Sequence, residues 1–230
     1  IPIIEKIDPD SEEVQAVIMA PTRELAMQIT DEMRDIAVYH EGVRLVCLYG
    51  GQPIGKQINA LKRKPQIVVA TPGRLSDHMK RRTVVLKAVK TVVLDEADRM
   101  LDMGFFDDIM QIVKQMPTKR QTILFSATLP PKIRQLAKQI LKDPAEINIA
   151  ISKPNEAIIQ SAYICYETQK MAIIQELFSK PNRKKTIIFS SSKQKVKDLA
   201  YSLKRMKLNV AAMHSDLEQV QREEVMLDFK

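Results

Sequence analysis

The sequence predicts an α/β protein with two lobes, each built on a parallel sheet covered by helices. Short, nearly continuous apolar runs rich in β-branched residues alternate with segments of helical period through most of the 230 residues. The same alternation begins again, in a shorter series, after a polar, Pro-containing stretch. Because parallel strands need crossover connections, repeated βαβ units of this kind favour a sheet with helices on both faces.

The first series contains six strand candidates with helices between them. The strands are expected at 16–20, 43–48, 66–70, 91–94, 122–126 and 146–150. The helices are expected at 23–37, 54–62, 107–116 and 131–142. These elements define a first domain over residues 1–150, and both helical and strand signals lapse in the linker that follows, residues 151–157.

The second series occupies residues 158–230 and opens with the apolar segment 160–166. Strands are expected at 186–190 and 209–213, and helices at 170–178, 195–206 and 217–229. The chain begins with IPIIEKI, without an initiating Met, and ends inside the last of these helices. We therefore expect it to be part of a longer protein.

Composition narrows the class of protein. The hydrophobic fraction of 45% and the charged fraction of 28% are typical of a soluble globular protein, and the net charge of +8 is compatible with a polyanionic partner. Cys47 and Cys165 lie far apart in apolar runs, which indicates free thiols in a reducing compartment, the cytosol or nucleus. No apolar run approaches the roughly 18 residues that span a bilayer, so no membrane association is expected. His40, His78 and His214 share no metal-ligand spacing, which argues against zinc.

Five polar or glycine-rich signatures follow the apolar runs of the first series. In chain order they are PTRELA, the pair Gly50–Gly51, TPGR, DEAD and SAT. Ligands of open parallel sheets bind at the carboxyl ends of the strands, where all five signatures are expected to meet. This coincidence is a stronger signal than any single tetrapeptide.

The DEAD segment predicts a site for a metal-bound nucleotide. Asp95 comes directly after a buried strand, where it is placed to hold Mg²⁺ together with waters and phosphate oxygens, as one or two carboxylates usually do. Glu96 is placed to orient a water for attack on a γ-phosphate, and it is a second candidate ligand of the metal. The alternative is that these acids only favour a helix N-terminus.

The remaining signatures suit a phosphate backbone. In PTRE and TPGR, a Thr and a Pro at a strand-to-helix turn leave backbone N–H groups free beside an Arg, and Gly50–Gly51 permits close approach. Ordinary N-capping is the alternative for each turn. Ser126 and Thr128 of SAT are placed to bond the acidic cluster, or else to form a simple turn.

The second series offers two weaker candidates. Ser190, Ser191 and Ser192 lie at the end of a strand candidate, where they are placed to contact a phosphate. Gln219 and Arg222 share one helix face. For the Gln219 and Arg222 pair, the equally good alternative is that both are ordinary surface side chains without a binding role.

Taken together and in this order, these five motifs resemble the DEAD-box family of ATP-dependent RNA helicases, with MLDMGFFDDI and SATLPPKIRQLA most similar to bacterial members. The resemblance covers the whole chain. It implies two RecA-like lobes, both incomplete here, a bound ATP with Mg²⁺, single-stranded or short duplex RNA as partner, a monomer, and a cytoplasmic location.

The resemblance also implies roles for the matching residues. Asp95 and Glu96 would serve Mg²⁺ and the hydrolytic water, with Asp95 acting on the metal through a water. Asp98, Ser126 and Thr128 would link the state of ATP to closure of the lobes. The residues that would grip the RNA backbone are Pro21, Thr22, Arg23, Gly51, Thr71, Pro72, Gly73, Arg74, Ser190, Ser191, Ser192, Gln219 and Arg222.

The sequence also departs from the family. The Gly-Lys-Thr phosphate loop and the arginine fingers do not occur in it. An arginine finger alone is worth about 10³ to 10⁵ in rate, so negligible ATPase activity is expected of this segment by itself. A DNA helicase or translocase of the same superfamily, and a non-enzymatic RNA clamp, remain as alternatives.

Overall fold

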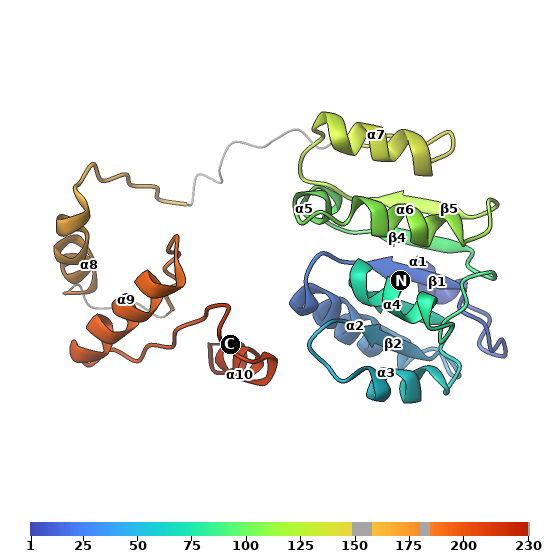
Figure 1. Cartoon of the computed structure of the whole chain (residues 1–230), viewed down its shortest axis with the longest axis horizontal. Coiled ribbons are helices and arrows are strands. Elements are labelled where there is room, and N and C mark those ends of the chain that lie inside the picture. The colour runs from blue at the N-terminus through green and yellow to red at the C-terminus, as the bar shows by residue number, and fades with distance from the viewer. Residues whose placement is uncertain (149–157, 180–184, 230) are drawn as a thin grey trace. The chain divides into compact units, whose positions relative to one another are not determined.

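The computed structural model describes residues 1–148, 158–179 and 185–229 (Figure 1). The chain divides into two compact units, Ile1–Ala145 and Glu146–Lys230. The predicted linker, residues 151–157, lies outside the described residues.

The first unit is built on a five-stranded parallel sheet. Its strands are β1 (Ala16–Met19), β2 (Leu45–Leu48), β3 (Ile67–Ala70), β4 (Thr91–Leu94) and β5 (Gln121–Leu124). Their order in the sheet is β2-β3-β1-β4-β5, and Val17 at the centre pairs in register with both Val68 and Val92. The predicted parallel α/β fold is confirmed in this unit, with five of the expected strands in place.

Seven helices accompany the sheet in the described part of this unit. They are α1 (Pro2–Glu5), α2 (Arg23–Ala37), α3 (Ile54–Leu61), α4 (Pro72–Lys80), α5 (Ala97–Asp102), α6 (Phe106–Lys114) and α7 (Pro131–Ile140). Apolar periodicity predicts α2, α3, α6 and α7. It misses α1 and shows α4 and α5 only as turns into a helix, because both are short and polar.

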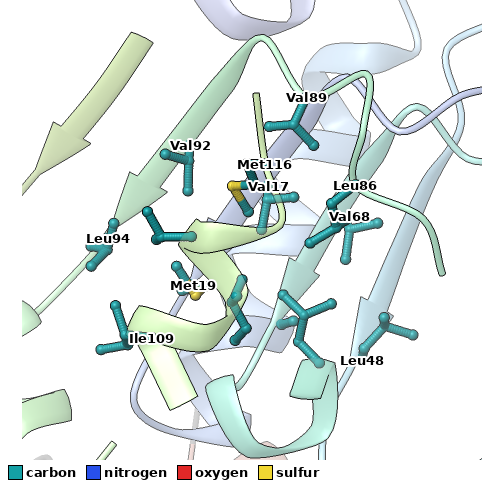
Figure 2. Close-up of a cluster of buried hydrophobic side chains, with 14 of the residues drawn as sticks. Val17, Met19, Leu48, Val68, Leu86, Val89, Val92, Leu94, Ile109 and Met116 are labelled. Carbon is teal, nitrogen blue, oxygen red and sulfur yellow. The ribbon is translucent and has the colours of Figure 1, made fainter. Parts of the chain in front are cut away.

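The three central strands β1, β3 and β4 are buried on both faces, which explains why they are nearly continuous apolar runs rather than alternating ones. Val17 and Met19 belong to one core cluster, on the face covered by α6, and Figure 2 shows them with Val92, Leu94 and Ile109. Ala16 and Ile18 belong to a second cluster on the opposite face, together with Ala26 of α2. The strand ends are therefore held by packing on two sides.

The expected sixth strand is wrong as far as the structure describes it. Glu146–Asn148 is not a strand and Ile147 is 87% exposed, while residues 149 and 150 lie outside the described residues. An apolar run forms a strand only where a neighbour accepts and donates its backbone hydrogen bonds. None of the five strands takes this segment as a partner.

The second unit contains helices but no strand among its described residues. Its elements are a 3₁₀ turn (Glu167–Gln169), α8 (Lys170–Ser179), α9 (Lys193–Arg205) and α10 (Gln219–Phe229). The three predicted helices are confirmed, but the strands expected at 186–190 and 209–213 do not form. Phe189 is 92% exposed, and Ala200 and Leu203 are the only described residues of this unit that are buried. No described strand pairs with these apolar runs, so they form no sheet.

Among the described residues, no helix combines the length and apolar character that a bilayer crossing requires.

Candidate functional site

The order of the strands places the five sequence signatures in a row along one edge of the sheet. All five strands are parallel, so their carboxyl ends share that edge. From β5 to β2, the segments that follow the strands are Ser126–Thr128, Asp95–Asp98, Pro21–Arg23, Thr71–Arg74 and Gly50–Gly51. The acidic turn therefore lies between the hydroxyl-bearing SAT segment and the three segments predicted to contact a phosphate backbone.

The acidic turn is fixed by backbone hydrogen bonds to both neighbouring strands. The N–H of Asp95 donates to the carbonyl of Met19 over 2.9 Å, and the N–H of Ala97 donates to the carbonyl of Phe125 over 2.9 Å. Between them Glu96 takes a left-handed conformation with φ +47°, which costs a non-glycine residue about 1–2 kcal/mol. Interactions of the surrounding residues must offset this cost for the conformation to persist.

Two of the three carboxylates of the turn make few contacts: Asp95 Oδ1 accepts from the Glu96 N–H at 3.0 Å, and the Glu96 side chain caps no helix. Asp95 is half-buried and Glu96 is exposed, and the Glu96 side chain makes no capping hydrogen bond to α5. Helix capping therefore does not explain Glu96. In the described part of the chain no group of three or more His, Cys, Asp or Glu side chains is arranged to hold a metal. A pair of carboxylates fits Mg²⁺, which completes its shell with waters and phosphate oxygens.

Asp98 joins the acidic turn to SAT. Its Oδ2 accepts from the Thr128 hydroxyl at 2.7 Å and from the Thr128 backbone N–H at 3.0 Å, while the Ser126 hydroxyl donates to the Thr128 carbonyl at 2.7 Å. Burial acts to raise the pKa of Asp98, but the hydrogen bonds from Thr128 and its neighbours outweigh it and hold the pKa below its usual value. The structure thus brings together the three residues that the sequence linked.

The PTRE turn caps a helix and reaches across to the glycine pair. The Thr22 hydroxyl accepts from the Leu25 N–H at 3.2 Å, so the capping role is real. The Arg23 guanidinium lies over Gly51, which has φ +88°; a Cβ added there would lie 2.9 Å from Arg23 Cζ. Glycine is therefore favoured here by the backbone conformation, and a side chain at this position would displace the Arg23 guanidinium.

The TPGR turn is tied to the same loop. The N–H of Thr71 donates to the Leu48 carbonyl at 3.0 Å, and Thr71 does not cap α4 with its side chain. Arg74 donates from Nη1 to the Gln52 carbonyl at 3.0 Å and to Gln57 Oε1 at 3.1 Å. Arg23 and Arg74 thus reach the β2–α3 loop from two different helices.

Two residues that the sequence did not single out hold Arg74 in place. Gln57 of α3 is 2% exposed, and its Nε2 donates to the Tyr49 carbonyl and to Gln52 Oε1, both over 2.9 Å. His78 is fully buried, with Nε2 3.0 Å from Gln57 Oε1 and Nδ1 2.8 Å from the Thr83 hydroxyl. Neither residue belongs to a local motif, because their partners lie in other elements.

His78 is kept neutral by its surroundings. Burial lowers the pKa of His78, and the positive charge of Arg74 adds to this effect. Because Gln57 Oε1 can only accept, the neutral ring must carry its proton on Nε2, leaving Nδ1 to accept from Thr83. The chain from Thr83 through His78 and Gln57 to Arg74 is then fully satisfied.

The second-unit candidates are more ordinary. The Ser192 hydroxyl caps α9 by accepting from the Lys195 N–H at 3.3 Å, while Ser190 and Ser191 are exposed. Gln219 donates to Glu223 at 3.0 Å along α10.

The same unit carries an exposed charge cluster near its serines. Asp216 accepts from Lys193 at 2.9 Å and from Lys197 at 2.8 Å, and these bonds lower its pKa to about 2. Lys193 therefore ties the start of α9 to the segment that precedes α10.

Comparison with known proteins identifies relatives for both units. Residues 1–151 match the family model described as DEAD/DEAH box helicase, and residues 169–230 match the helicase conserved C-terminal domain. The chain is 42% identical to an ATP-dependent RNA helicase CshA of Listeria monocytogenes and 40% identical to a DEAD-box ATP-dependent RNA helicase CshA of Bacillus subtilis. Both matches cover the whole of this chain but only 44% and 47% of those proteins.

A solved structure shares the fold. It is that of a DEAD box protein from the hyperthermophile Methanococcus jannaschii, with 37% sequence identity and a TM-score of 0.62. The match covers all of this chain and 61% of that one.

Proposed function

Because the chain belongs to the DEAD/DEAH box helicase family, we propose that it works within an ATP-dependent RNA helicase. That protein would bind single-stranded RNA by its backbone and couple ATP hydrolysis to the opening of short duplexes or the remodelling of RNA–protein complexes. One observation carries the proposal: acidic, hydroxyl and phosphate-binding segments lie in a single row along the carboxyl edge of one sheet.

On the nucleotide side, Asp95 and Glu96 are the proposed working groups. Asp95, backed by a buried strand, would hold Mg²⁺ through a water, and Glu96 would orient the attacking water. When bound, Mg²⁺ would neutralise charge on the phosphates. The left-handed turn at Glu96 supports this role, since Glu96 is exposed just after the end of β4 and its side chain makes no capping hydrogen bond.

Asp98, Ser126 and Thr128 are proposed to pass the state of the nucleotide to the rest of the protein. Their hydrogen bonds join the acidic turn to the segment that leads into α7. A shift of the turn would therefore move Thr128 directly, because Asp98 bonds it without another residue between them.

On the RNA side, the proposed contacts are backbone N–H groups and arginines rather than base-reading side chains. Pro21–Arg23, Gly51 and Thr71–Arg74 stand next to one another in the row, so one strand can meet them in succession. Contacts of this kind grip phosphates and carry little sequence preference. In the second unit, Ser190–Ser192 with Gln219 and Arg222 are proposed to contribute in the same way.

Hydrolysis by this 230-residue chain alone is proposed to be negligible. Its sequence contains no Gly-Lys-Thr segment to cradle the phosphates.

The decisive experiment is Glu96→Gln in the whole protein, with ATPase, ATP-binding and RNA-binding assays run in parallel. We expect ATP and RNA to bind as before while turnover falls by about 10² or more, since a positioned general base contributes about 10²–10⁴. Near-normal turnover would remove Glu96 from its role. Equal stimulation by DNA and RNA would favour a DNA translocase, and RNA binding without hydrolysis in the unmodified whole protein would favour a clamp.

A further inference from the structure

A groove of about 530 Å³ runs along the outer edge of β2. β2 is the last strand of the sheet on this side, and Leu45–Cys47 line the floor of the groove. Residues of α2 and of α3, which flank β2 (Figure 1), also line it. The groove is therefore a slot at the sheet edge, separate from the acidic turn after β4.

The groove is strongly cationic. Its lining includes Arg34, Arg44, Lys56 and Arg63 but a single carboxylate, Asp31. Asp31 is already paired with Arg34 over 2.9 Å. Arg44 donates to backbone carbonyls, and within the described parts of the chain Lys56 and Arg63 form no ion pair. This surplus of positive charge suits an anionic chain.

The sheet edge adds hydrogen-bond donors to these cations. The Arg44 carbonyl accepts from the Ile67 N–H of β3 at 3.2 Å, and the Leu48 carbonyl accepts from the N–H of Thr71, just after β3, at 3.0 Å. Backbone groups alternate sides along a strand, so those of Leu45 and Cys47 face away from β3, toward the groove. Unpaired N–H groups beside Lys and Arg are typical partners of phosphate oxygens.

The groove begins where the row of RNA-binding segments ends. In the sheet, Pro21–Arg23 after β1 comes first, then Thr71–Arg74 after β3, then Gly50–Gly51 after β2. A polynucleotide that follows this row therefore arrives at the β2 edge. Gln52, next to Gly51, lines the groove, and its carbonyl accepts from Arg74. Lys56, in the first turn of α3, follows Gln52 along the chain and lines the same groove.

We propose that this groove binds the phosphodiester backbone of the RNA strand as it continues past Gly50–Gly51. The inference rests on the proposed RNA-binding function and extends it to an added subsite. An acidic extended peptide laid along β2 is the competing occupant; RNA is favoured because the groove opens directly from the row.

The test compares RNA lengths in the whole protein. Affinity is measured by fluorescence anisotropy for oligouridylates of about 6 and about 20 nucleotides, across a series of salt concentrations. The variant is Lys56→Ala with Arg63→Ala; the control is Lys87→Ala with Lys114→Ala, two exposed lysines that do not line the groove. A charge-conserving Lys56→Arg, Arg63→Lys pair tests rescue.

We expect the groove variant to lose affinity only for the long RNA. Each lost phosphate contact lowers the salt slope for a single strand by about 0.7, so two contacts lower it by about 1.4, or about 25-fold in affinity at 0.1 M salt. The short RNA and the control pair should change less than about twofold, and the charge-conserving pair should restore most of the loss.

Three outcomes would overturn the subsite. The first is that the groove variant binds the long RNA with unchanged affinity, and the second is that it loses affinity equally for both lengths. The third is that it keeps its RNA binding but loses binding of a poly-glutamate peptide, which would assign the groove to acidic peptides. Failure of the proposed function is distinct, because the unmodified protein would then bind neither RNA.

Discussion

Replacing Gln57 with Leu tests whether the buried polar network holds the first unit together. The side chain is 2% exposed and makes four hydrogen bonds, to Tyr49, Gln52, Arg74 and His78. Leu removes all four and leaves the fully buried His78 Nε2–H without an acceptor, which costs about 1–3 kcal/mol. The other three bonds are worth about 0.5–1.5 kcal/mol each, and the buried leucine offsets about 1–2 kcal/mol. The central values of these terms give an expected net loss of about 3.5 kcal/mol.

The assay is urea denaturation followed by far-ultraviolet circular dichroism, since the chain has no Trp. Gln111→Leu, at an exposed position on α6, is the matched control and should change stability by less than about 0.5 kcal/mol. A cycle with His78→Leu should give a coupling energy of about 1–2 kcal/mol. A loss below about 1 kcal/mol for Gln57→Leu, or strict additivity with His78→Leu, would refute the network as a stabilising unit.

Three other measurements bear on contacts of the same sheet edge. The folded state keeps the pKa of His78 below its ordinary value, so at low pH the unfolded chain binds an extra proton. The free energy of unfolding should therefore be at its full value above about pH 6.5 and fall at lower pH. His78→Gln should flatten this part of a profile of urea midpoint against pH. Gly51→Ala should weaken RNA binding by the whole protein about tenfold in an anisotropy titration, because a methyl group at φ +88° displaces Arg23, whereas Gly55→Ala, in open space, should not. Asp98→Asn should lower duplex unwinding more than ATP hydrolysis, because Asp98 bonds Thr128 rather than facing outward, and equal losses in the two assays would contradict that role.

Sequence reasoning succeeds where a local pattern has one physical solution. The run of Ala16–Met19 is apolar on both faces because two core clusters need it, and Thr22 caps α2 as its position before an amphipathic run predicts. Because the strands are parallel, as their apolar runs predict, the five signatures share one edge of the sheet.

It fails where the partner is distant in sequence. Gln57 and His78 lie 21 residues apart and meet only because α3 and α4 flank neighbouring strands. In its local context, Gln57 is one polar residue in an amphipathic helix, and His78 is one of three unconnected histidines. In the second unit the strand signals at 186–190 and 209–213 are local too, but a ladder needs a second strand, and the described residues supply none.

The stretch from the acidic turn to Phe105 does more than carry carboxylates, because its start contacts SAT and its far end contacts the TPGR turn. At its start, the N–H of Ala97 bonds Phe125 and Asp98 bonds Thr128, which ties it to SAT. At its far end, the ring of Phe105 lies against Gly73 of the TPGR turn, where an added Cβ would meet it at 3.7 Å. Since packed interiors transmit small shifts rather than absorb them, a displacement of this stretch must also shift SAT and the TPGR turn. The stretch from the acidic turn to Phe105 thus joins the proposed nucleotide and RNA segments within a single lobe.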